Sequence, residues 1–150
     1  MTSKMLMEIL KTQDLNLDLL IKSLEEQKKA IVRNDYEGLR KLLDDEQRLL
    51  KEISIEEANR IKAVNTLVEQ FSIEVKNNSL AELMKAGRKY FPNDFKELQF
   101  VRSSLGEKIK KIMNLNSQLK NIISFSRQMV KELIMIIAGP NKHSLVNRRV

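Results

Sequence analysis

The chain of 150 residues contains no cysteine and no tryptophan, and it has only two prolines, four glycines and one histidine. Without cysteine it can form no disulfide, no thiolate metal site and no cysteine nucleophile. The scarcity of proline and glycine removes most turn and strand signals. What remains is dominated by Leu, Ile, Lys, Glu and Asn, a composition typical of helices.

Long apolar runs are also absent. The longest, Leu133 to Ala138, is far shorter than the roughly 20 residues that span a bilayer. The first residues already carry Glu8 and Lys11 within an amphipathic pattern, so the apolar core of a signal peptide is missing. We therefore expect a cytoplasmic protein that does not insert into a membrane.

Patterns for catalysis, metal binding and cofactor binding are missing as well. The single histidine, His143, follows the last proline, where nothing would hold it within about 3 Å of a reaction partner. Adjacent carboxylates such as Glu25 and Glu26 point to different sides of a helix and do not converge. The chain has no Glu-x-x-His pair and no Gly-rich phosphate loop. We expect no enzyme, no cofactor, no metal and no small-molecule substrate, and instead a protein that binds another protein.

The net charge of +7 raises the possibility of nucleic-acid binding. Residues 1–75 hold 12 basic and 15 acidic side chains, whereas residues 76–150 hold 15 and 5. The basic residues of the second half recur at helical spacing, and no aromatic residues lie between them to stack on bases. This distribution favours a solvated helix face over a nucleic-acid interface.

Apolar residues alternate at spacings of three and four along three long segments, which predicts helices that pack against one another. The first segment runs from Leu6 to Ile31, and the second from Tyr36 to about Lys76. The seam of the third is predicted to consist of Leu98, Val101, Leu105, Ile109, Ile112, Asn116, Leu119, Ile123, Ser126, Val130, Leu133 and Ile137.

Capping patterns predict where these helices begin and end. Asn34 is expected to cap the second helix, with Glu37 completing a capping box. The sequence Ser79-Leu80-Ala81-Glu82 is a second capping box, and it predicts a short helix that closes at Gly87, Phe91 and Pro92. Asn93 or Asp94 then caps the last helix, which ends at Ala138-Gly139-Pro140.

The fold predicted from these segments is all-α, with three long antiparallel helices in an extended bundle or coiled-coil hairpin and one short helix. Residues 1–140 are expected to form a single helical-bundle domain. Residues 141–150 are polar and basic without periodicity, and we expect them to form a flexible tail.

Polar residues fall on the predicted seams at five positions: Gln13, Gln27, Glu46, Arg60 and Asn116. A buried polar residue in a helix seam fixes register and partner choice at some cost in stability. The alternative is that the rotation of each helix places them at the edge of its interface. Asn116 is the strongest candidate for an internal position, because Ile112 and Leu119 flank it.

The second half of the last helix carries more apolar residues than one seam can bury. One interpretation is a broad core at a thick end of the bundle, and the other is a surface for the amphipathic helix of a partner. The candidate partner-binding residues are Leu119, Ile122, Ile123, Phe125, Met129, Val130, Leu133 and Ile137.

Four stretches, in their order and spacing, resemble a known family. The segment KKAIVRNDYEGLRKLLDDEQRLLKE, from Lys28, resembles the helical hairpin of the FlgN-type flagellar export chaperones. Glu57 and Arg60 match that family's E-x-x-R, and residues 79–83 are similar to its S-L-x-E-L. Leu115-Asn116, Ile122-Ile123 and Ser126 lie where it carries L-N-x-x-N-x-x-LL-x-x-S, although Leu119 replaces the second asparagine. A tyrosine often found after the last proline is absent.

The resemblance covers residues 5–138 and implies a cytoplasmic chaperone. Such a protein binds the C-terminal amphipathic segments of hook-associated proteins at the hook–filament junction, prevents their premature polymerisation and delivers them to the flagellar export apparatus. In this family the client binds the C-terminal helix, which here is the segment with the apolar surplus. A self-associating structural coiled coil and a basic nucleic-acid-binding protein remain as alternatives.

Overall fold

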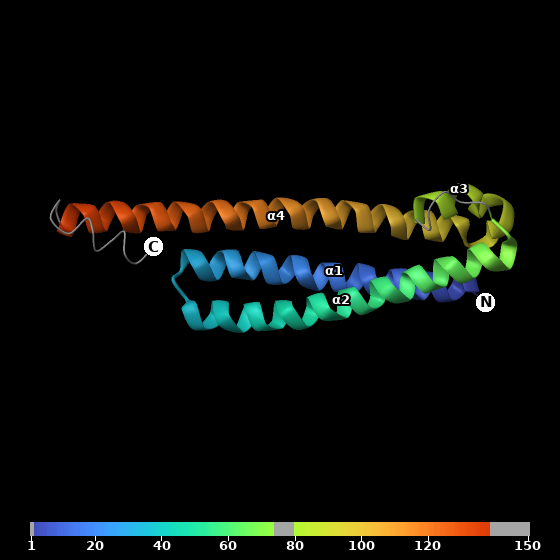
Figure 1. The fold of residues 1–150 in the computed structure, drawn as a ribbon, viewed down its shortest axis with the longest axis horizontal. Helices are drawn as coiled ribbons and strands as arrows, with labels where there is room; N and C mark the ends of the chain where they lie inside the picture. Colours follow the sequence, from blue (N-terminus) through green and yellow to red (C-terminus); the bar gives the residue numbers. More distant parts are fainter. Residues whose placement is uncertain (1, 74–79, 139–150) are drawn as a thin grey trace.

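The computed structural model describes residues 2–73 and 80–138. It contains four helices, α1 (Thr2–Val32), α2 (Tyr36–Phe71), α3 (Leu80–Tyr90) and α4 (Pro92–Ala138). The predicted all-α fold with three long helices and one short helix is confirmed (Figure 1). Consecutive long helices reverse direction, so α2 is antiparallel to α1 and α4, and these two run parallel to each other.

The turn between α1 and α2 differs from its prediction. Asn34 does not cap α2, because it has a positive φ of 57° and closes α1 instead. Asp35 N donates to Ala30 O and Asn34 N to Ile31 O, which is the pattern of a Schellman motif. Asparagine tolerates this left-handed conformation. The N-cap of α2 is Asp35, whose Oδ1 accepts a hydrogen bond from Gly38 N at 3.0 Å.

Helix α2 ends at Phe71, before the predicted Lys76. Ser72 adopts a φ of 51°, and Ile73 N donates to Val68 O, so a second left-handed residue closes this helix. The predicted break at 77–79 lies outside the described residues.

Helices α3 and α4 meet at Phe91. Gly87, predicted to close α3, lies inside it; a Cβ there would meet the Phe91 ring at 2.7 Å, so glycine lets that ring pack closely. Helix α4 begins at Pro92, a residue suited to the first helical position, and neither Asn93 nor Asp94 is its cap. Asp94 lies in the first turn and accepts a hydrogen bond from Ser3 Oγ at 2.7 Å.

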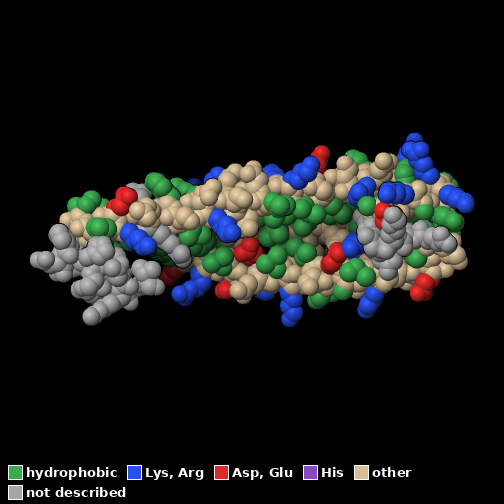
Figure 2. Space-filling model, turned by 45° about the horizontal axis from the view of Figure 1, so that its top comes forward, with side chains coloured by type: hydrophobic (Ala, Val, Ile, Leu, Met, Phe, Trp, Pro, Cys, Tyr) green, Lys and Arg blue, Asp and Glu red, His purple; other side chains and the backbone are tan. Residues whose placement is uncertain are grey.

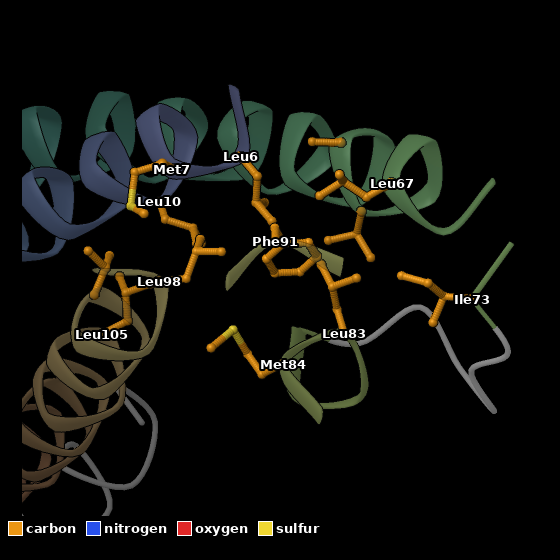
Figure 3. Packing of buried hydrophobic residues seen from close by; sticks show 13 residues of the cluster. Leu6, Met7, Leu10, Leu67, Ile73, Leu83, Met84, Phe91, Leu98 and Leu105 are labelled. Atoms are coloured by element: carbon orange, nitrogen blue, oxygen red, sulfur yellow. The ribbon is translucent and has the colours of Figure 1, made fainter. Parts of the chain in front are cut away.

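The larger of the two described core clusters lies at the end of the molecule that contains α3. There Leu6, Leu67, Leu83 and Phe91 from three helices and the α3–α4 turn point toward one another (Figure 3). All four are buried. A smaller cluster joins α1 to the middle of α4 through Leu20, Ile21, Leu24, Leu115 and Leu119.

The parallel packing of α1 and α4 has a constant register. Side chains joined by hydrogen bonds between the two helices are 91, 90 and 90 residues apart, at Ser3–Asp94, Asp14–Ser104 and Lys28–Gln118. The end of α1 at Val32 therefore lies beside residues 121–123. At 1.5 Å per residue, residues 124–138 reach about 22 Å beyond α1. Figure 1 shows this α4 extension, as we name residues 124–138, projecting past the α1–α2 turn.

Candidate protein-binding surface

The seam of α4 against α1 differs from its prediction after Leu105. The residues that face α1 are Leu98, Val101, Leu105, Lys108, Ile112, Leu115, Leu119 and Ile122. Asn116, predicted to be internal, is exposed, and Ile109 is 49% exposed. The predicted seam and the observed seam both have residues at alternating spacings of three and four. From the sequence alone the seam with Ile109 was favoured because it contains no lysine, whereas the structure places Lys108 in the seam.

Lys108 is accommodated there because two carboxylates of α1 receive its charge. Its Nζ donates to Asp14 Oδ2 at 2.7 Å and to Asp18 Oδ2 at 2.9 Å, and Ser104 Oγ donates to Asp14 Oδ1 at 2.9 Å. Burial acts to lower the pKa of Lys108, but the two carboxylates outweigh it and hold that pKa above its ordinary value. These groups fix the register of α4 on α1.

A second polar group joins α1 to α2. Gln13, which is buried, donates from Nε2 to Glu57 Oε2 at 2.9 Å. Arg60 donates to the same carboxylate from Nε to Oε2 at 2.8 Å and from Nη2 to Oε1 at 2.5 Å. The bonds from Arg60 lower the pKa of Glu57 against the opposing effect of burial. Gln13 is thus internal, whereas Arg60 is half-buried.

The other polar seam residues differ in environment. Gln27 is 4% exposed and donates to Ser23 Oγ of its own helix at 3.2 Å. Glu46 is half-buried. These positions therefore divide between the interior, the half-buried edge and, for Asn116, the surface.

The predicted partner-binding residues do not share one environment. Leu119 is buried in the smaller core cluster and Ile122 is half-buried. Five others are 41–82% exposed: Ile123, Phe125, Val130, Leu133 and Ile137. The side chain of Met129 lies outside the described part of the chain. The interpretation of this stretch as bundle core therefore holds at Leu119 and in part at Ile122, but not at the five exposed residues, because α1 and the α1–α2 turn end before they can cover them.

The α4 extension thus presents apolar side chains on several sides. Ile134, Met135 and Ile136 are also exposed, in addition to the predicted residues. A contiguous apolar surface of this kind marks an interaction site. Where the extension begins, a cavity of about 470 Å³ lies between the end of α1 and α4, and it is lined by Ile31, Val32, Asn34, Asn121, Ile122 and Phe125.

The described residues offer little for other kinds of chemistry. Among residues 2–73 and 80–138, no three His, Asp or Glu side chains are grouped to hold a metal ion. None of the helices in these ranges has a stretch long and apolar enough to cross a bilayer. His143 lies outside the described residues.

Comparison with known proteins identifies the family. No curated protein and no solved structure shows a significant match. The family model described as the FlgN protein matches residues 1–147, almost the whole chain. That match and the hairpin-plus-long-helix architecture agree with the resemblance in the sequence. The chain belongs to the FlgN family of flagellar export chaperones, which bind flagellar proteins.

Proposed function

We propose that this chain is a cytoplasmic chaperone for hook-associated proteins of the hook–filament junction. It binds their C-terminal amphipathic segments, keeps them from polymerising and delivers them to the flagellar type III export apparatus. The observation that carries the proposal is the α4 extension, whose apolar side chains have no cover from α1 or α2 in the described structure. An amphipathic helix of the client supplies that cover.

The energetics suit a reversible complex. Burying one exposed apolar side chain such as Leu133 or Val130 contributes roughly 1.5–3 kcal/mol. Several such side chains line the extension, and the loss of translational and side-chain freedom offsets much of their sum. The result is binding strong enough to block polymerisation and weak enough to release the client for export.

The test is binding of a purified C-terminal fragment of a hook-associated protein, measured by isothermal titration calorimetry. Val130→Asp with Leu133→Asp places two charges on the extension and should weaken binding at least 30-fold. The matched control is Leu15→Asp with Leu19→Asp on α1, where the two leucines are about as exposed, and it should bind like the wild type. Circular dichroism checks that both variants stay helical.

Equal binding by the extension variant and the wild type would show that this surface is not the client site. Sedimentation of the protein with and without the client fragment measures its oligomeric state, which distinguishes a chaperone from a self-associating coiled coil. A monomer that forms a complex only with the fragment supports the chaperone, and a stable oligomer that ignores the fragment contradicts it.

A further inference from the structure

Helix α3 occupies the place of a fourth helix over only part of the bundle. It packs on α4 and also contacts α2, where Leu83 and Met84 join Val64, Leu67 and Leu98 in the larger core cluster. Its 11 residues span about 16 Å, whereas the 36 residues of α2 span about 54 Å. Helix α1 separates α2 from α4, and beyond α3 none of the described helices lies against the α3-facing side of the three long helices.

The flank of α2 that α3 covers continues beyond α3 as an apolar stripe. Val68 packs against the larger cluster. Ile61 precedes it by 7 residues, Leu50 precedes Ile61 by 11, and Leu43 precedes Leu50 by 7, spacings that keep all four on one face. The last three are 41–47% exposed.

This stripe is distinct from the groove on the outer side of the hairpin. There Asp45 and Glu52 of α2 face Lys22 and Glu26 of α1 around a cavity of about 460 Å³. Successive helical residues are rotated by about 100°. Leu43 and Leu50 therefore lie on the opposite flank of α2 from Asp45 and Glu52, on the side of α4.

Helix α4 carries a matching stripe. Lys108 lies in the seam that faces α1, and Lys111 lies on the outer flank, where it pairs with Glu25 of α1. Ile109 and Met113 lie on the other flank, in line with Phe95, which packs against the larger cluster, and they are 49% and 65% exposed.

The space between the two stripes is open and apolar. Hydrophobic side chains gather in a hollow along the middle of the molecule, below α4 (Figure 2). We name this surface the fourth-helix slot and define it by Leu43, Leu50, Ile61, Ile109 and Met113.

We propose that an amphipathic helix of the client fills the fourth-helix slot, in line with α3, and continues onto the α4 extension. The proposal rests on the proposed function, because it names the path of the same client. Helix α3 supplies the precedent, since it already covers the neighbouring part of the same side of the long helices. Arg102 lies seven residues before Ile109, and Lys120 lies seven residues after Met113, so both exposed basic side chains are on the same face of α4 as the slot residues. A client helix that fits the slot therefore carries acidic residues beside its apolar stripe.

Site-specific thiol labelling tests this path, because the wild-type chain has no cysteine. Four single variants report on three surfaces: Leu50→Cys and Met113→Cys in the slot, Ile136→Cys on the extension and Leu15→Cys on the outer face of α1. All four side chains are 47–78% exposed, so each substitution should leave the fold intact, which circular dichroism verifies. The rate of maleimide labelling is measured with and without a saturating C-terminal fragment of a hook-associated protein.

The fragment should slow labelling at positions 50, 113 and 136 at least 10-fold and leave position 15 unchanged. Protection at 136 alone would overturn the slot and leave the proposed function standing. Protection at positions 50 and 113 but not at 136 would support binding of the client in the slot and contradict its binding on the extension. Failure of the fragment to bind, or binding that protects none of these positions, would overturn both.

Discussion

Single polar residues decide how the long helices of this protein align. Lys108 lies in an otherwise apolar seam, and its side chain, like that of Asp14, is largely buried at 20% and 24% exposure. Removing one member of such a group leaves the others desolvated and unpaired. The comparable pair Lys111–Glu25, at 3.5 Å, is far more exposed, and pairs of that kind contribute little.

Lys108→Met should therefore lower the free energy of unfolding by about 1–3 kcal/mol, because Asp14 and Asp18 lose their shared cation. Lys111→Met should change it by less than about 0.5 kcal/mol. Urea unfolding followed by circular dichroism measures both. Equal losses in the two variants would show that the Lys108 group adds nothing beyond an ordinary surface pair.

Glu57 should make stability depend on pH. Its pKa is lowered in the folded protein, chiefly by the bonds from Arg60, so the folded state favours the ionised carboxylate. The resulting stability is present above the unfolded pKa, about 4.3, and is lost as the pH falls through the lower folded value. The difference in thermal midpoint between the wild type and Glu57→Gln should be larger at pH 7 than at pH 3. A difference that stays constant with pH would contradict this assignment.

At the scale of the element, α4 is divided by the end of α1. Residues 98–122 pack on α1, whereas the α4 extension has hydrogen bonds of its own helix but no tertiary cover among the described residues. Local opening costs least where few side chains are packed. The same helix should therefore contain two segments of different stability.

Hydrogen exchange measured by mass spectrometry should show this division directly. Backbone amides of residues 124–138 should exchange at least 10-fold faster than those of residues 98–122 in the free protein. A bound C-terminal client fragment should slow the exchange of the extension, because its side chains become covered. Uniform protection along α4 without client would mean that another part of the protein already covers the extension.

At the scale of the whole molecule, charge is divided between the two halves of the chain. The first 75 residues carry 12 basic and 15 acidic side chains, and the remaining 75 carry 15 and 5. The extension and one rim of the fourth-helix slot both belong to the basic half. A positive field near a binding surface speeds encounter with an acidic partner and weakens as salt is added.

The association rate with an acidic client segment should accordingly fall several-fold between about 50 and 500 mM salt, while the dissociation rate changes less. Lys120→Gln with Lys131→Gln should lower the rate at low salt and flatten its dependence on salt. Stopped-flow fluorescence with a labelled fragment measures both. An association rate independent of salt would show that the charge division plays no part in client capture.

The sequence by itself was sufficient for the helices and their class of architecture. Helical periodicity and capping are local properties, so the long segments and the short helix could be predicted from neighbouring residues. The predicted caps were wrong at Asn34 and at Asn93 or Asp94. Asn34 instead pairs the last carbonyls of α1 through the Schellman motif, while Asp35 caps α2. At the start of α4, Pro92 takes the first helical position, where it has no N–H that needs a partner.

Only the tertiary structure decided which side of each helix meets a neighbour. Along α4 two stripes of equal periodicity compete, and the carboxylates of Asp14 and Asp18, about 90 residues away in sequence, select the one with Lys108. The same register sets the point at which α1 ends beside α4. It thereby determines that residues after Ile123 remain uncovered, because exposure depends on the relative lengths and offset of two helices and on no local pattern in either.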